Sequence, residues 1–366
     1  MSLRCIDQLK SAKKIAILVH QNADTDALGS AIALRRIITD NFDQKTCIDI
    51  FTETEEEDFN EKDENLIKNE HINTRTQKKY DLAVILDIST RSRLGKYDEI
   101  FRKASDSLNI DHHITNNNFA KNNIVLTSCS STCEILYLLL IKSQKLKCSP
   151  QTLAVLYSGI ITDTNNLTQN LGPRTFNVIE EINKIAKQNE IDIDKIRNHY
   201  FKNNTKESNQ LLARALTSLT YSDDGKIAMM KITKQDFKET GASQNDTLGI
   251  VDFAINTKGV EVGVIFIKNE DNTYYVSLRS KNENINVGEI AKQMGGGGHS
   301  KVAAFQTKKD DNLTDIKAKL TSLCNEQLKK AENLFEDVSS LFSEIENKDV
   351  ETEEDNEESE QIDLVK

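Results

Sequence analysis

The stretch from Ala16 to Ser30 constrains the possible fold more than any other part of the sequence. It reads AILVHQNADTDALGS. The apolar run Ile15–Val19 has the length and β-branching of a buried strand, and an apolar helical pattern begins at Ala27. The loop between a strand's carboxyl end and the next helix is where ligands bind in open α/β sheets. This loop carries one imidazole and two carboxylates: His20, Asp24 and Asp26.

Two interpretations fit this loop. An imidazole and two carboxylates within seven residues form a natural ligand set for a divalent metal ion. Alternatively, Asp24 or Asp26 only caps the helix that follows. Gly29 and Ser30 keep the start of this helix small, so we expect a substrate to approach the backbone closely there.

The order of apolar segments predicts an α/β fold. In the first half, strand-like runs alternate with amphipathic helical stretches, which is typical of a parallel sheet with helices on both faces. The second half is richer in strands and predicts a smaller mixed α/β domain. The expected strands are Ile15–Val19, Cys47–Phe51, Leu82–Leu86, Ser107–Ile110, Asn123–Leu126, Lys226–Ile232, Val260–Ile267, Thr273–Leu278 and Val302–Gln306. The expected helices are Ala27–Thr39, Lys96–Ala104, Thr132–Ser143, Gln151–Ile161, Thr175–Gln188, Val287–Met294 and Leu313–Leu334.

The chain is expected to divide into four parts. These are a first domain over residues 1–190, a helical connector over 191–215, a second domain over 216–330, and a tail over 331–366. The tail holds 14 acidic and 2 basic residues, which predicts a disordered segment. Because the formal net charge of the chain is −11 and the tail carries −12, the remaining residues carry +1. A nearly neutral body can accept an anionic substrate.

Nothing in the sequence indicates a membrane or secreted protein. No apolar run approaches the ~20 residues that span a bilayer, and the start MSLRCIDQLK lacks the apolar core of a signal peptide. The six cysteines contain no CxxC pair, so we expect reduced thiols and a cytoplasmic protein. Cys129 and Cys133 are interpreted as buried structural thiols.

Four groups of acidic or imidazole side chains follow apolar runs in the first half. They are His20 with Asp24 and Asp26, then Asp87, then Asp111 with His112 and His113, and finally Asp163. Each group alone has a plain explanation as a cap or turn, but four in equivalent positions favour one shared site. Their number suits a pair of divalent ions, which lie ~3.5–4 Å apart in two-metal sites. Mixed imidazole and carboxylate ligands favour Mn²⁺ over Mg²⁺.

A run of four glycines, Gly295 to Gly298, precedes His299 in the second half. Glycines adopt positive φ readily, and successive amide groups then form an anion-binding concavity. The alternative is a flexible loop without a ligand.

Together these motifs resemble the DHH phosphoesterase superfamily. The glycine run with His299 resembles the signature of its DHHA1 C-terminal domain, and the resemblance covers roughly residues 10–325. The layout is most similar to the bacterial oligoribonuclease/pAp phosphatase group, which also contains enzymes that act on cyclic di-AMP and pApA. The resemblance implies a parallel-sheet DHH domain that binds metal and a DHHA1 domain that binds substrate.

The resemblance also implies a role for each matched residue. One Mn²⁺ ion would be held by His20, Asp24 and Asp87, and the other by Asp26, Asp87, His112 and Asp163. Mg²⁺ or Co²⁺ would be the substitutes. A hydroxide between the ions would attack phosphorus. Asp111 would orient His112, and His113 would contact the scissile phosphate or assist the leaving oxygen. The substrate contacts would be Arg93, Arg279, Ser280, Gly295, Gly296, Gly297, Gly298 and His299.

The sequence departs from the family pattern at three places. Ala23 stands where the family usually has proline, and Phe305 stands where it has a small residue. After Asp163, the segment NNLTQNLGPRTF lacks the usual glycine and the Asn-Thr-Thr run. Because this segment lies near the substrate in relatives, it leaves the substrate specificity open.

The expected function is a Mn²⁺-dependent phosphodiesterase or phosphatase that hydrolyses short 5′-phosphorylated oligonucleotides, pApA or cyclic di-AMP, or pAp. One alternative is an inorganic pyrophosphatase of the same superfamily, against which the glycine run argues. Another is a nucleotide-binding protein without catalysis, although no expected metal ligand is missing. No basic, aromatic-rich groove indicates a long nucleic acid as partner. The sequence leaves the oligomeric state open, with a homodimer among the alternatives.

Overall fold

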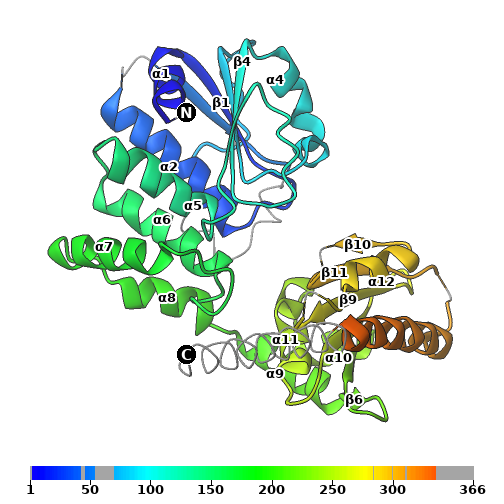
Figure 1. The fold of residues 1–366 in the computed structure, drawn as a ribbon. Helices are drawn as coiled ribbons and strands as arrows, with labels where there is room; N and C mark the ends of the chain where they lie inside the picture. Colours follow the sequence, from blue (N-terminus) through cyan, green and yellow to red (C-terminus); the bar gives the residue numbers. More distant parts are fainter. Residues whose placement is uncertain are drawn as a thin grey trace, which may run out of the picture. The chain divides into compact units, whose positions relative to one another are not determined.

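The computed structural model describes residues 2–42, 46–53, 70–282, 284–298, 300–309 and 311–334. The chain forms two compact units, Met1–Asn203 and Asn204–Lys366, and each has its own sheet (Figure 1). His299 and residues 335–366 of the expected acidic tail lie outside the described residues. The boundaries expected at residues 190 and 215 stay predictions.

The sheet of the first unit is parallel throughout its described strands, as expected. Its strands are β1 (Lys14–Leu18), β2 (Cys47–Phe51), β3 (Leu82–Leu86), β4 (Asp106–Asp111) and β5 (Asn122–Val125). They lie in the order β2-β1-β3-β4-β5. In this order β1 is flanked by β2 on one side and β3 on the other, so the connections leave β1 and β3 in opposite directions. The carboxyl ends of these two strands therefore meet at the topological switch point, where α/β sheets bind ligands.

Helices cover both faces of this sheet (Figure 1). One face carries α1 (Ser2–Ser11), α2 (Thr25–Asn41), α5 (Thr132–Leu136) with its wider continuation η4 (Tyr137–Ser143), and α6 (Pro150–Asp163). The helices α7 (Thr175–Gln188) and α8 (Ile193–Phe201) pack against α6. The other face carries the 3₁₀ segment η3 (Arg91–Tyr97) and α4 (Asp98–Lys103).

The role expected of Gly29 and Ser30 is wrong. A Cβ on Gly29 would lie 3.2 Å from the carbonyl oxygen of Val155 and 3.4 Å from the Sγ atom of Cys133. Ser30 is fully buried and donates its hydroxyl to the carbonyl of Ala27 at 2.9 Å. These small residues let α2 pack closely against α5 and α6, and they do not open the backbone to a substrate.

The second unit is built on a mixed sheet, again as expected. Its strands are β6 (Thr220–Tyr221), β7 (Ile227–Ile232), β8 (Val262–Lys268), β9 (Tyr274–Ser280), β10 (Gly297–Gly298) and β11 (Val302–Gln306). They lie in the order β10-β11-β9-β8-β7-β6, and only the β7–β8 pair is parallel among them. One face packs on α9 (Lys206–Thr217), α10 (Lys234–Thr240) and α11 (Ile250–Ile255). The other packs on α12 (Val287–Gln293) and on the helix over residues 313–334.

The second half of the glycine run, Gly297–Gly298, forms the edge strand β10 of this sheet, which the sequence did not indicate. A Cβ on Gly296 would overlap the carbonyl oxygen of Ala304 and lie 2.5 Å from the Cβ of Phe305. One on Gly298 would overlap Ala303, whereas Gly297 has no atom within 4 Å of its Cβ position. Packing against β11 therefore requires glycine at positions 296 and 298, whereas the Cβ position of Gly297 is open. Phe305 is buried in this core.

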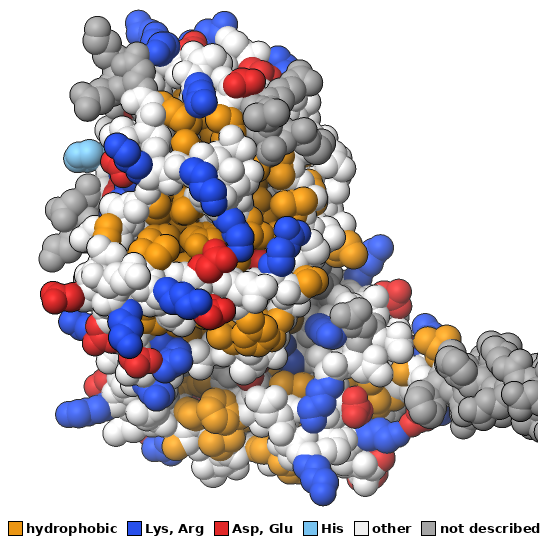
Figure 2. Space-filling view, turned by 60° about the vertical axis from the view of Figure 1, so that its left-hand side comes forward, with side chains coloured by type: hydrophobic (Ala, Val, Ile, Leu, Met, Phe, Trp, Pro, Cys, Tyr) orange, Lys and Arg blue, Asp and Glu red, His pale blue; other side chains and the backbone are white. Residues whose placement is uncertain are grey.

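Hydrophobic side chains also reach the surface of the first unit. Leu138, Ile141 and Ile185 are only partly buried where they pack against the core. On the face drawn in Figure 2, hydrophobic side chains are visible between Lys and Arg side chains. Cys129 and Cys133 are both buried and free, as expected of structural thiols. None of the helices in the described ranges combines the length and hydrophobicity that crossing a membrane requires.

Candidate metal centre

His20 follows β1 and is held in one orientation by the backbone. Its ring is 3% exposed, and Nδ1 donates a hydrogen bond to the carbonyl oxygen of Gln21 at 2.6 Å. Because the carbonyl only accepts, Nδ1 carries a proton, and Nε2 is the nitrogen left to face the site. Nε2 lies 3.8 Å from Asp24 Oδ2 and 3.5 Å from Asp87 Oδ2. The imidazole is therefore oriented as a metal-ligating His usually is.

Asp24 fits both interpretations of its loop at once. It is the N-cap of α2, and its Oδ1 accepts a hydrogen bond from the amide of Ala27 at 3.0 Å. Its other oxygen faces His20. The cap thus fixes the carboxylate without using the oxygen that points into the site.

Asp87 lies at the centre of the cluster. It follows β3 with φ of 60°, a left-handed conformation that few residues other than glycine adopt. Its amide donates to the carbonyl of Ile110 at 3.1 Å. Oδ2 faces His20, while Oδ1 lies 3.4 Å from His112 Nε2. One buried carboxylate therefore connects two imidazoles from different strands.

Asp26 is held by backbone amides of a distant element. Its Oδ2 accepts from the amide of Thr132 at 2.8 Å, and its Oδ1 accepts from the amide of Cys133 at 3.0 Å. The side chain is 1% exposed. Burial, followed by the negative charge of Asp87, raises the pKa of Asp26 to about 6.

Asp163 joins the cluster from the carboxyl end of α6. Its Oδ2 lies 3.6 Å from His112 Nε2. This oxygen is buried and has no hydrogen-bond partner among the described residues. Burial, together with the negative charge of Asp26, raises the pKa of Asp163 well above its usual value. A buried carboxylate oxygen without a donor is costly, and a cation would remove that cost.

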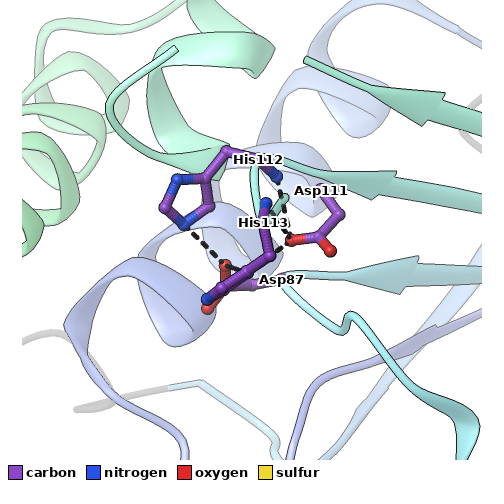
Figure 3. A group of neighbouring side chains, drawn as sticks. All are labelled: Asp87, Asp111, His112 and His113. Carbon is purple, nitrogen blue, oxygen red and sulfur yellow. Dashed lines mark hydrogen bonds and ion pairs between the residues drawn. The ribbon is translucent and has the colours of Figure 1, made fainter. Parts of the chain in front are cut away.

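Asp111 orients His113, whereas the resemblance had implied that it orients His112. Its Oδ1 accepts from His113 Nδ1 at 2.7 Å and from the backbone amide of His112 at 2.9 Å (Figure 3). Its Oδ2 accepts from Asn116 Nδ2 at 2.6 Å. The ring of His112 faces Asp87 instead (Figure 3). Both histidines thus lie near Asp87 Oδ1, since His113 Nδ1 is 3.6 Å from it, and the ring of His113 is the one that bonds Asp111.

The charges of this cluster are mutually dependent. Burial by itself lowers the pKa of His20, but the carboxylates of Asp24 and Asp87 outweigh it and raise the pKa to about 10. Burial likewise opposes the charged form of His112, and Asp87 and Asp163 raise its pKa to about 10. In turn, burial favours a neutral Asp87, but hydrogen bonds from His112 and His20 hold its pKa well below the usual value. Cations that replace the protons on these rings would satisfy the same carboxylates.

The potential ligand atoms form three overlapping sets among the described residues. In each set one atom per residue lies within 4.8 Å of the others. The first set is His20, Asp24 and Asp87, the second is Asp26, His112 and Asp163, and the third joins Asp87 and His112 to Asp111 and His113. Asp87 Oδ1 lies beside His112 of the second set. Imidazole nitrogens with carboxylate oxygens, one of them unpartnered, suit divalent transition-metal ions. The described residues therefore fit a metal centre.

Comparison with known proteins decides the family. Residues 14–160 match the DHH family N-terminal domain, and residues 224–326 match the DHHA1 domain. The chain belongs to the DHH/DHHA1 phosphoesterases. Proteins of this kind are hydrolases of phosphoester bonds, so the chain is an enzyme of that class.

Two relatives and one solved structure extend this assignment. The chain is 29% identical over 300 residues to a probable bifunctional oligoribonuclease and PAP phosphatase of Streptococcus mutans, covering 80% of this chain and 89% of the relative. It is 24% identical over 327 residues to a cyclic-di-AMP phosphodiesterase of Listeria monocytogenes, covering 86% of this chain and 48% of the relative. An exopolyphosphatase-related protein of Bacteroides fragilis has the same fold, with a TM-score of 0.77, 19% identity, and coverage of 92% of this chain and 97% of that one.

Three DHH-domain residues that support the centre were missed by the sequence analysis. Thr132 and Cys133 donate their amides to Asp26, as described above. A Cβ on Gly159 would overlap the Sγ atom of Cys133 and lie 2.8 Å from Asp26 Oδ1. No local spacing reveals these contacts, because Thr132 and Cys133 lie more than a hundred residues from Asp26. The capping pattern Ser131-Thr132-Cys133-Glu134 was the one available signal.

The candidate substrate residues have separate surroundings. In the DHH domain, Arg93 contacts the loop of His20 through its carbonyl, which accepts from the amide of Gln21 at 3.1 Å. In the DHHA1 domain, Arg279 Nε lies 3.3 Å from Asp252 Oδ1, and Nη1 donates to Ser277 Oγ at 3.1 Å.

Ser280 lies differently from what the sequence suggested. It is buried and donates its hydroxyl to the carbonyl of Asn282 at 2.7 Å. Because side chains alternate along a strand, Ser277 and Arg279 share one face of β9, and Ser280 lies on the opposite face. This position argues against a direct contact of Ser280 with a substrate held by Arg279.

Proposed function

We propose that the chain is a Mn²⁺-dependent phosphodiesterase and phosphatase acting on short 5′-phosphorylated oligonucleotides, pApA or cyclic di-AMP, and pAp. The observation that carries this proposal is the position of Asp87. Its two oxygens face different imidazoles, which belong to two adjacent sets of ligand atoms. This is the arrangement that a carboxylate shared by two ions requires.

The metal-binding roles are proposed for the residues that the geometry brings together. His20, Asp24 and Asp87 would hold one ion, and Asp26, Asp87, His112 and Asp163 would hold the other. When bound, such a pair of divalent ions activates water and stabilises the attacking and leaving oxygens of a phosphoryl displacement. Mn²⁺ is proposed because its ligands are mixed imidazole and carboxylate, whereas Mg²⁺ prefers oxygen ligands.

The chain's own groups would supply proton transfer and phosphate binding. His113 is fixed by Asp111 at the edge of the cluster, and we assign it the protonation of the leaving oxygen or contact with the scissile phosphate. Arg279 is kept in place by Asp252 and Ser277, and a guanidinium held in this way binds a phosphate bidentately. Arg93 and the glycine run stay proposed contacts of the substrate.

The substrate class is supported by the relatives. The S. mutans relative is named for oligoribonuclease and PAP phosphatase activity, and the chain covers 89% of it. The L. monocytogenes relative is named for cyclic di-AMP, and the chain covers 48% of it. We therefore propose short linear oligonucleotides and pAp ahead of cyclic di-AMP. The DHHA1 match argues against the pyrophosphatase alternative, which needs another C-terminal domain.

A panel of substrates tests this proposal. Purified full-length chain with Mn²⁺ is given pApA, pAp, cyclic di-AMP, RNA of two to five nucleotides and pyrophosphate, and the products are separated by chromatography. We expect mononucleotides from pApA and short RNA, AMP from pAp, and loss of all turnover with a chelator. Hydrolysis of pyrophosphate alone would contradict the proposal, and so would full activity in the chelator.

Two further expectations concern the protein in the cell. A cytoplasmic location and a homodimer stay predictions. The partly buried hydrophobic side chains of Leu138, Ile141 and Ile185 in the first unit are compatible with a second copy as partner. Light scattering on the purified protein measures its mass directly.

A further inference from the structure

We propose that Thr132 is a positioning residue that sets which oxygen of Asp87 faces which set of metal ligands. This inference rests on the metal centre of the proposed function. Thr132 is fully buried and is the first residue of α5. Its Oγ1 donates to Asp87 Oδ1 at 3.1 Å, and its amide donates to Asp26 Oδ2 at 2.8 Å. It is therefore bonded to both a shared ligand and a ligand of the second set.

The carboxylate of Asp87 needs such a partner because its oxygens are not equivalent here. Oδ2 lies 3.5 Å from His20 Nε2, and Oδ1 lies 3.4 Å from His112 Nε2. Rotation of the carboxylate would direct both oxygens away from the imidazoles at once, and rotation about this bond is soft. The hydroxyl of Thr132 holds Oδ1 on the His112 side, and its hydrogen bond opposes that rotation.

The position of Thr132 makes its hydroxyl available for this bond. Within a helix, a threonine hydroxyl often bonds to the carbonyl three or four residues earlier. At the first residue of α5 those carbonyls belong to the preceding loop, and the cap is supplied by Ser131, whose side chain accepts from the amide of Glu134 at 3.0 Å. The hydroxyl of Thr132 is thus directed to Asp87.

Loss of this hydroxyl should weaken metal binding on one side of the centre. The contact is made to Oδ1, so the affected ion is the one bound with His112. Removal of a partner that orients a ligand typically weakens metal affinity by about 10–100-fold. We expect one of two Mn²⁺ binding steps to weaken by about this factor in Thr132→Val. The other step and the kcat at saturating Mn²⁺ should stay close to wild type.

Calorimetric titration of the metal-free, full-length chain with Mn²⁺ tests this role. Thr132→Val removes the hydroxyl and keeps the branched shape, and Thr132→Ser keeps the hydroxyl and should restore the affinity. Thr132→Ala repeats the test if the valine variant does not fold. Thr175→Val is the matched control, because Thr175 is equally buried and donates its hydroxyl to another carboxylate, Glu134 Oε2, at 2.8 Å. It should leave both Mn²⁺ steps unchanged.

The outcomes separate this inference from the function on which it rests. If the wild type binds fewer than two Mn²⁺ ions, the metal centre is wrong and the role of Thr132 is wrong with it. If the wild type binds two ions and Thr132→Val binds both as tightly, only the role of Thr132 is overturned. A serine variant as weak as the valine variant would also overturn it, because the hydroxyl would then not be the cause.

Discussion

The two conspicuous motifs of this chain work in opposite ways. At the switch point of the DHH domain, the motif consists of side chains, and donors from a distant helix hold the carboxylates of Asp26 and Asp87 in place. At the edge of the DHHA1 sheet, the motif consists of residues without side chains, and two of the glycines fit closely against β11. A motif of functional groups thus depends on its surroundings for orientation. A motif of glycines is required because its surroundings leave no room for a Cβ atom.

The largest effect is expected at the carboxylate that both ligand sets share. Asp87→Asn should lower kcat by at least ~10³-fold, because it removes a charge that both ligand sets use. Steady-state kinetics on pApA with saturating Mn²⁺ measures this.

Asp49→Asn is the control for this change. Asp49 is a carboxylate of the same sheet that is also buried, and it bonds Tyr80 and Thr76 outside the metal centre. It should keep wild-type kcat wherever it is folded. Near-wild-type turnover of Asp87→Asn would rule out a shared carboxylate.

The next effect concerns the guanidinium of Arg279 on β9, which β11 separates from the glycine strand β10. Loss of a charge-assisted hydrogen bond costs ~1.5–3 kcal/mol, so Arg279→Ala should lower kcat/KM on dinucleotides by roughly 10–150-fold. An aryl phosphodiester without a second nucleotide should be affected far less.

Arg214→Ala is matched to this variant, since Arg214 belongs to the same compact unit and pairs with Glu239 on its surface. It should leave both substrates unaffected. An equal loss on both substrates in Arg279→Ala would place Arg279 in folding or at the metal centre, and would remove the distinction between the two regions.

A smaller effect is expected from packing around the metal centre. Gly159→Ala introduces a methyl group that overlaps Cys133 Sγ and approaches Asp26. Overpacking of this kind typically costs ~1–3 kcal/mol of unfolding free energy, and the shift of Asp26 should also weaken Mn²⁺ binding. Gly29→Ala meets its neighbours at 3.2 Å or more and should cost less. Urea unfolding with parallel Mn²⁺ titration distinguishes them, and equal behaviour would contradict the packing argument.

The smallest effect is expected from Gly297→Ala, which is compared with its neighbour Gly296→Ala at the DHHA1 edge. Gly296→Ala should destabilise the domain by about 1–3 kcal/mol, since its methyl group would overlap the carbonyl of Ala304. Gly297→Ala should leave the unfolding free energy within about 0.5 kcal/mol of wild type, because its Cβ position is open. If Gly297→Ala raises KM for dinucleotides, the open face of β10 contacts substrate. Equal destabilisation by both variants would contradict the alternation.

Local patterns predicted the elements with short, strongly apolar cores. Cys47–Phe51, Leu82–Leu86 and Val302–Gln306 have the expected bounds because short, mostly apolar runs between polar residues allow few alternatives. The short helices α10 and α11 were missed, since seven and six residues show too little periodicity. The strand at Gly297–Gly298 was missed because glycine has a low strand propensity, which tertiary packing overrode.

The sequence predicted which side chains form the site, but not the groups that hold them in place. The positions after β1, β3 and β4 follow from the parallel sheet, since the carboxyl ends of its strands share one edge. The donors on Thr132 and the close approach of Gly159 depend on how α5 and α6 dock, which no local spacing encodes. The family resemblance likewise implied that Asp111 orients His112, and only the structure shows its bond to the ring of His113.

The double use of Asp24 has a consequence for motion. One oxygen of this residue caps the first turn of α2 by accepting from the Ala27 amide, and the other faces His20. Fraying of that turn and loss of the ligand are therefore a single event, so the two equilibria are linked by mass action. An ion bound at His20 should slow the hydrogen exchange of the Ala27 amide, and the amide would report the occupancy of the site from the start of the helix.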